Sequence, residues 1–224
     1  MSDSLPSLPQ YRVSIWEGIT VLAGAVLLIA VGAAGLGVKA LNNAFDPERA
    51  EAIAHSMADY AIPGGSQGLF GTNVGGGRAA VIGSIASLQA APPLPDMPPV
   101  TLPEVELLIA RVPVQSGSNT GSDAPEKLGS EFLFSGFSFS NQTPDSFQVN
   151  TTRVEEKAFC GAIAPVKIEE GNLTLTDQAL PVPAVRYEVQ VTLDKENHVA
   201  IVSAAGKTAR ENAATVFESM KCKP

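Results

Sequence analysis

The stretch VRYEVQVTLDKENHVAIVSAA, residues 185–205, decides the fold. From Val185 to Leu193, apolar side chains alternate with polar ones, and this period of two residues is typical of a half-buried β-strand. The polar run at 194–197 indicates a turn, and residues 199–204 then return as an apolar partner strand. We therefore predict a β-hairpin here, and its first strand is the most regular in the chain.

A closing helix is predicted directly after this hairpin. Thr208 stands three residues before Glu211, which is the spacing of a capping box at a helix N-terminus. The apolar residues that follow recur at helical spacing and form one face. These residues are Ala209, Ala213, Val216, Phe217 and Met220.

A second amphipathic helix is predicted at 46–61. Asp46 can cap it, Pro47 suits the first helical position, and Glu48 complements the positive end of the helix dipole. Pro63-Gly64-Gly65 then ends it. The predicted apolar face consists of Ala50, Ile53, Ala54, Met57 and Ala61.

The segment GGSQGLFGTNVGGG, residues 64–77, is half glycine, so we predict a loop. It is not a phosphate-binding loop, because Gly77 stands where that motif requires lysine. Two interpretations stay open. The loop is purely structural, or it binds a partner by inserting Leu69 and Phe70 into a protein or into the bilayer interface.

Other segments suggest four more strands, a phenylalanine-rich strand and two polar connections. Together with the two helices they predict an α+β domain over residues 45–224, with an antiparallel sheet covered by helices. The strands are expected at 79–86, 104–112, 147–154 and 158–168, and a further strand carries Phe132, Phe134, Phe137 and Phe139; the connections are a Pro-rich stretch at 92–103 and a polar loop at 116–127.

The N-terminal region contains twenty-one uncharged residues in a row, GITVLAGAVLLIAVGAAGLGV at 18–38. A helix of that length spans about 31 Å, close to the thickness of the bilayer core. We predict a transmembrane helix at 14–40 after a polar tail at 1–13; a cleaved signal peptide and a buried core helix are the alternatives. One face of small residues could let two such helices associate: Ala30, Ala33, Ala34 and Gly37.

Two features bear on the side of the membrane that holds the domain. Lys39 and Arg49 follow the span while Arg12 precedes it, which weakly favours a cytoplasmic domain. The two cysteines, Cys160 in a predicted strand and Cys222 beside the last helix, are a candidate disulfide, and disulfides persist in oxidising compartments. We expect a single-pass membrane protein with its C-terminal domain outside the cytoplasm.

Charge and motifs argue against several activities. The net charge is −8, and the sequence contains no cluster of Lys and Arg residues that could bind phosphate groups. Nucleic-acid binding is therefore not expected. His55, with Glu51 and Asp59 on the same helical face, is interpreted as part of a solvated surface, and His198 is expected at the surface too. We predict no catalytic residue, no cofactor and no metal, and an enzyme is not favoured.

The soluble part resembles the PsbP-like fold through its final hairpin and helix and through the IPGG turn at Ile62–Gly65. That fold is known from lumenal proteins associated with photosystem assembly, so the resemblance implies a binding or assembly role. The Pro-rich and Ser/Gly-rich inserts depart from a compact version of the fold.

Taken together, these features favour a membrane-anchored accessory or interaction protein. It would dock its α+β domain onto a membrane complex or an envelope partner. A small-ligand, lipid-binding or sensory domain is the first alternative, and an enzyme of unrecognised type is the second.

Overall fold

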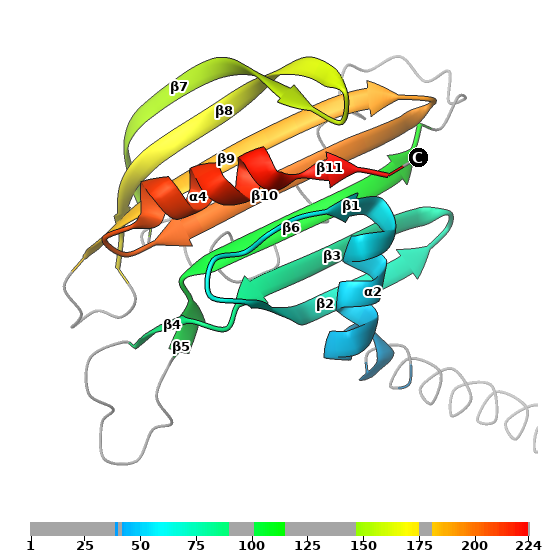
Figure 1. Ribbon diagram of the computed structural model, residues 1–224, viewed down its shortest axis with the longest axis horizontal. Coiled ribbons are helices and arrows are strands. Elements are labelled where there is room, and N and C mark those ends of the chain that lie inside the picture. The colour runs from blue at the N-terminus through cyan, green and yellow to red at the C-terminus, as the bar shows by residue number, and fades with distance from the viewer. Residues whose placement is uncertain (1–38, 40–41, 90–100, 115–146, 175–180, 224) are drawn as a thin grey trace, which may run out of the picture. The chain divides into compact units, whose positions relative to one another are not determined.

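A computed structural model describes residue 39 and residues 42–89, 101–114, 147–174 and 181–223 (Figure 1). The chain divides into two compact units, residues 1–42 and 43–224, and the helices and strands named below belong to the second. In the part of the chain that is described, no helix has the length and apolar character needed to cross a bilayer. The predicted transmembrane helix at 14–40 lies outside the described residues except for Lys39, and its small-residue face lies wholly outside them.

A seven-stranded antiparallel sheet forms most of the second unit (Figure 1). Two small two-stranded sheets accompany it: β1 (Ala58–Asp59) pairs with β11 (Lys221–Cys222), and β4 (Ser87–Gln89) pairs with β5 (Thr101–Pro103). The strands of the main sheet lie in the order β2 (Ser66–Val74), β3 (Gly77–Ser84), β6 (Val105–Pro113), β10 (Glu196–Ala205), β9 (Val182–Leu193), β8 (Ala162–Leu173) and β7 (Phe147–Phe159).

The predicted hairpin is confirmed as β9 and β10. Its turn is only two residues long, Asp194 and Lys195, and both have a positive φ, 50° and 66°, which suits the right-handed twist of the flanking strands. β10 also pairs with β6 on its other side. The hairpin therefore lies inside the sheet and links its two halves.

Two helices, α2 (Pro47–Met57) and α4 (Ala209–Ser219), cover the same face of the sheet (Figure 1). α2 packs on β2 and β3, whereas α4 packs on β9 and β10. The main core lies between these helices and the sheet, and its largest fully buried side chains include Ile82, Leu107, Val166, Ile168, Val202 and Val216. A smaller cluster on the opposite face contains Val81, Leu108, Ala110 and Val199.

Both helices begin where the sequence predicts, but their details differ. Asp46 caps α2, because its Oδ1 accepts the backbone N–H of Glu48 at 3.0 Å. α2 ends at Met57 instead of 61, since the next two residues leave the helix to form β1. The capping box at Thr208 is wrong: its side chain makes no cap hydrogen bond and instead accepts from Nδ2 of Asn212 at 3.1 Å.

The glycine-rich segment 64–77 is mostly strand β2 and not a loop, so that prediction is wrong. Gly68 and Gly71 face α2 at very close range. A Cβ on Gly68 would lie 2.2 Å from the carbonyl oxygen of Pro47, and one on Gly71 would lie 2.6 Å from Cα of Ala50. Because these glycines have no Cβ, the backbone of α2 can approach the sheet closely, and such a close approach is a known reason for glycine within a strand.

The strands predicted near 79–86 and 104–112 are confirmed as β3 and β6. Those predicted at 147–154 and 158–168 are longer, and they meet at a two-residue turn, Cys160-Gly161, with positive φ values of 51° and 79°. Cys160 thus lies in a tight turn and not within a strand. The polar loop, the phenylalanine-rich strand and most of the Pro-rich stretch lie outside the described residues.

We expect Gly68→Ala to lower the free energy of unfolding by about 1–3 kcal/mol, because the added Cβ overlaps the backbone of α2. Urea unfolding of the full chain in detergent, followed by circular dichroism, measures this change. Gly77→Ala is the matched control, because a Cβ there meets no atom closer than 3.5 Å. Equal losses in both variants would contradict the proposed role of Gly68.

Candidate functional site: an exposed edge hairpin and a buried cysteine–histidine cluster

Strand β7 forms one edge of the main sheet. Among the described residues it pairs with β8 alone, and nearly every residue from Gln148 to Ala158 is exposed or half-buried. Edge strands present unpaired backbone groups that can hydrogen-bond another chain. β7 is therefore a candidate binding edge of the main sheet.

The face of the β7–β8 hairpin that points away from α4 carries exposed apolar side chains. Ala164, Val166 and Ile168 of β8 are buried in the core beneath α4, so the residues between them point to the opposite face. Val154 and Ile163 are 64% and 70% exposed there. We call this surface the apolar strip; it consists of Val154, Ala158, Ile163 and Pro165, all exposed.

Ion pairs flank the apolar strip on the same face. Glu169 is almost buried; its carboxylate lies 2.7 Å from Nζ of Lys167 and accepts a hydrogen bond of 3.0 Å from Nε of Arg186. Burial alone would raise the pKa of Glu169, but the hydrogen bonds from both cations lower it below its ordinary value. The strip therefore has a charged border.

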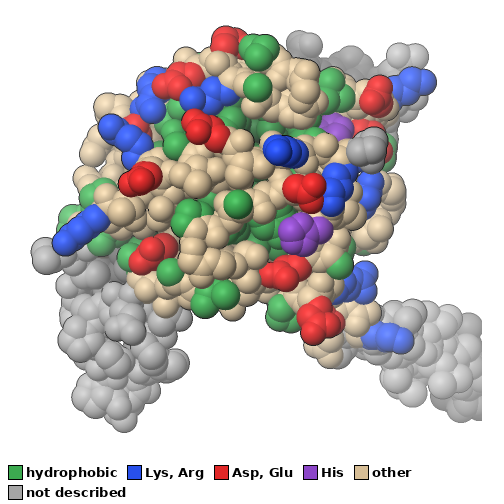
Figure 2. Space-filling model, in the orientation of Figure 1, with side chains coloured by type: hydrophobic (Ala, Val, Ile, Leu, Met, Phe, Trp, Pro, Cys, Tyr) green, Lys and Arg blue, Asp and Glu red, His purple; other side chains and the backbone are tan. Residues whose placement is uncertain are grey.

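On the helix side, charged side chains fasten the hairpin to α4. Arg153 of β7 contacts Glu155 at 2.6 Å, and Lys157 contacts the same carboxylate at 3.1 Å. Arg153 also pairs with Glu170, which in turn pairs with Arg210 of α4. The Arg153 guanidinium holds the pKa of Glu170 below its ordinary value. Figure 2 shows charges of both signs interspersed over this face.

A depression of about 510 Å³ lies beside the N-terminus of α4. Its polar lining includes Asn150, Thr151, Glu170, Lys207 and Arg210. It opens to the surface and is not the apolar cavity between sheet and helix that a lipid-binding function would predict.

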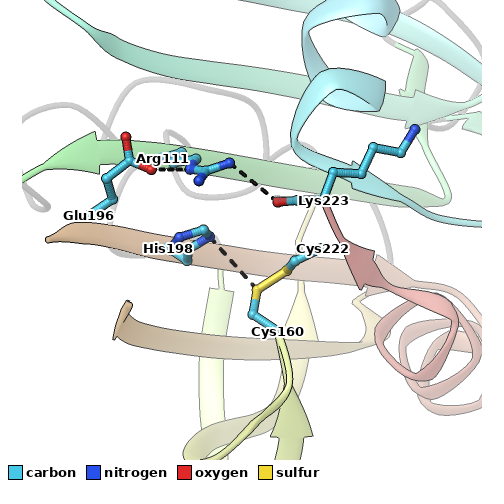
Figure 3. The surroundings of a disulfide bond; sticks show 6 residues. All are labelled: Arg111, Cys160, Glu196, His198, Cys222 and Lys223. Atoms are coloured by element: carbon cyan, nitrogen blue, oxygen red, sulfur yellow. Dashed lines mark hydrogen bonds and ion pairs between the residues drawn. A yellow bond between two sulfur atoms is a disulfide. The ribbon is translucent and has the colours of Figure 1, made fainter. Parts of the chain in front are cut away.

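The predicted disulfide between Cys160 and Cys222 is present (Figure 3). It joins the β7–β8 turn to β11, with 4.9 Å between the two Cα atoms and a sequence separation of 62 residues. Both cysteines are half-buried. The bond therefore ties the C-terminal end of the chain to the tip of the edge hairpin.

His198 of β10 lies next to this disulfide, with Nδ1 3.9 Å from Sγ of Cys160 (Figure 3). The sequence predicted it at the surface, but it is only 8% exposed because its strand lies in the middle of the sheet. Burial lowers the pKa of His198, and the nearby Arg111 guanidinium lowers it further. Its imidazole is therefore neutral at pH 7.

Arg111 and Lys223 hold the C-terminal strand in place around this cluster. Arg111 pairs with Glu196 and donates from Nη1 to the backbone oxygen of Lys223 at 3.3 Å (Figure 3). The backbone N–H of Lys223 donates to the carbonyl of Met57 at 2.8 Å, and its Nζ lies 2.7 Å from Asp59. The end of the chain is thus fixed to β6 and to the end of α2.

The remaining predicted residues lie apart from the cysteine–histidine cluster. His55 is exposed on α2 and stacks on Tyr60 with ring centroids 4.8 Å apart. Leu69 and Phe70 are half-buried on β2, where they pack against the smaller core cluster, and Phe70 contacts Phe45 edge to face. Their role in binding a partner stays a prediction.

No family model and no curated protein matches this sequence. One solved structure with some similarity is that of LpqN, involved in cell envelope biogenesis of Mycobacterium tuberculosis. It is 12% identical, the alignment covers 75% of this chain and 83% of LpqN, and the TM-score is 0.38. A likeness at that level carries no argument about fold or function. The resemblance to the PsbP-like fold stays a prediction.

We expect the double variant Cys160→Ala/Cys222→Ala to be less stable than the wild type by about 2–4 kcal/mol, because the disulfide closes a long loop. Urea unfolding without reductant measures the difference. A strong reductant should lower the stability of the wild type and leave that of the double variant unchanged. Equal stabilities of the two oxidised proteins would contradict this prediction.

Stability should also fall below about pH 6.5 through His198. Its pKa is lowered in the folded state from 6.5, so below that value the unfolded chain binds more protons and acid favours unfolding. His198→Gln should flatten this part of the pH profile, whereas His55→Gln, at the exposed histidine, should retain it. Urea midpoints between pH 5 and 8 test this, and identical slopes for wild type and His198→Gln would contradict it.

Proposed function

We propose that this chain is a membrane-tethered accessory protein that binds a protein partner outside the cytoplasm through its β7–β8 hairpin. The observation that carries the proposal is the apolar strip beside an edge strand whose only described partner strand is β8. The proposal has three parts: the binding mode, the compartment and the membrane tether.

The binding mode follows from the physical properties of the hairpin. Natural proteins usually protect a sheet edge with a short strand, a proline or a bulge that turns it away. β7 is 13 residues long and contains no proline, its bulge lies near its start between Val149 and Thr151, and the exposed Val154 comes after that bulge. An extended segment of a partner can add to such an edge as a further strand, with backbone hydrogen bonds for affinity and side-chain contacts for specificity.

The pattern of side chains also suits an interface. Protein interfaces generally have an apolar centre and a polar rim. Here the apolar strip forms the centre, which Glu156 interrupts opposite Pro165, and the ion pairs of Glu169 with Lys167 and Arg186 form the border. Isolated apolar residues on a surface need no explanation, but four exposed apolar residues on one face of an edge hairpin favour a docking role.

The compartment and the tether rest on different observations. The disulfide between Cys160 and Cys222 supports an oxidising, extracytoplasmic location. The uncharged run at 18–38 has the length of a membrane span and supports a single-pass tether. The polar depression beside α4 favours a small polar ligand as the second candidate function.

Site-specific photo-crosslinking in isolated membranes tests the binding mode. A benzoyl-phenylalanine at position 154 or 163 should give one adduct of the same mass, because both positions lie on the apolar strip. The matched control is position 74, where Val74 is 75% exposed but lies on β2 at the opposite edge of the sheet. Adducts from all three positions, or from none, would contradict the proposal.

Substitution gives the corresponding loss of function. Val154→Lys together with Ile163→Lys should reduce co-isolation of the crosslinked partner about tenfold or more, since burying an unpaired charge is costly. Val74→Lys should have no effect. Unchanged co-isolation with the double variant would show that the partner binds elsewhere.

A further inference from the structure

We propose that Cys160, Cys222 and His198 form a binding site for a thiophilic divalent cation, of which Zn²⁺ is the type, once the disulfide is reduced. The proposal is independent of partner binding at the apolar strip. It rests on the arrangement of three potential ligand atoms, on their surroundings and on a small separation of the two sulfurs that rotation of the cysteine side chains can supply.

The ligand atoms are already close to metal-site geometry. Within the described part of the chain, these three side chains form a group whose ligand atoms all lie within 4.8 Å of one another. In a tetrahedral zinc site, bond lengths of about 2.3 Å to sulfur and 2.0–2.1 Å to nitrogen place S and N about 3.6 Å apart and two sulfurs about 3.8 Å apart. The distance from Sγ of Cys160 to Nδ1 of His198 is 3.9 Å, so this pair needs almost no movement.

Cys222 supplies the movement that remains. Its sulfur must separate from that of Cys160 by roughly 2 Å to reach the spacing of a zinc site. Arg111 and the contacts of Lys223 hold the backbone of β11, so the movement falls to rotation of the Cys222 side chain. The pocket around the disulfide is too small for a water molecule, so the cation would take the space that the separating sulfurs vacate.

The surroundings favour the ligand forms of the three groups. Nδ1 of the imidazole faces the sulfur of Cys160 (Figure 3), and apolar side chains including Met57 and Phe159 line the same pocket. The Arg111 guanidinium lies close by and stabilises negative charge on the sulfurs, as basic groups near cysteine do. Two thiolates and one neutral imidazole are the ligand set that soft or borderline cations prefer.

The chemistry balances with a dithiol reductant. The dithiol transfers two electrons and two protons, the Cys160–Cys222 bond breaks to give two thiols, and the dithiol becomes a disulfide. Binding of the divalent cation then displaces both thiol protons, which leave to solvent, and forms two metal–sulfur bonds and one metal–nitrogen bond. The two thiolates cancel the charge of the cation, and the three side chains supply three of the four positions of a tetrahedral site.

Cobalt titration of the reduced chain tests the proposal. The full chain, purified in detergent and kept under a phosphine reductant without oxygen, should bind one Co²⁺ with a thiolate-to-cobalt charge-transfer band and visible d–d bands. Zn²⁺ should displace the Co²⁺, and the oxidised chain should show neither band. His198→Gln should weaken Co²⁺ binding about tenfold or more, since losing even a group that only orients a ligand typically costs 10- to 100-fold.

His55→Gln is the matched control, because the exposed histidine of α2 lies outside the cluster, and its Co²⁺ affinity should equal that of the wild type. A reduced chain that stays folded and binds no Co²⁺, or a His198→Gln variant with unchanged affinity, overturns the proposal. If reduction unfolds the domain, Zn²⁺ should restore its circular dichroism spectrum; failure to do so also overturns it.

Discussion

The structure depends on the register of β10, which pairs with β6 on one side and with β9 on the other. Side chains alternate along a strand, so this register decides which residues face the two helices. It directs Ala200, Val202 and Ala204 into the main core. The same alternation places His198 on the helix side, beside the disulfide. A slip of one residue would move all four to the opposite face, so the core and the cysteine–histidine cluster have one common cause.

The end of the chain closes the structure around that strand. β11 pairs with β1 directly after α2, while Cys222 is bonded to the β7–β8 turn. Arg111 of β6 holds the backbone of Lys223 from a third side. Three residues that follow the last helix, 221–223, thus connect both helices to the centre and to the edge of the sheet. The disulfide holds together two residues that are 62 positions apart in the sequence, so the entropic cost of closing this long loop is not paid again on folding of the oxidised chain.

Local signals in the sequence predict the elements whose causes are local. The β9–β10 hairpin follows from alternation and a polar turn, and the start of α2 follows from Asp46 and Pro47. The failed capping box is also local, because Thr208 accepts from Asn212 instead. Three other misses have a different origin, because each depends on a distant segment. Gly68 belongs to a strand because α2 packs on it, and the end of α2 is set by β11. The burial of His198 depends on the pairing of β10 on both sides. The cysteine pair was predictable because the chain has only two cysteines.

The disulfide and the ion pairs with α4 also determine how rigid the edge hairpin is as the proposed binding surface. At its tip, the disulfide joins Cys160 to the C-terminal strand; along its length, Glu170 bridges Arg153 of β7 and Arg210 of α4. A long hairpin at a sheet edge would otherwise bend freely, and ordering it on binding would cost conformational entropy. Held at both points, it presents the backbone of β7 and the apolar strip in one fixed arrangement. Because one of the two fastenings is a disulfide, the redox state of Cys160 and Cys222 also sets how firmly that surface is held.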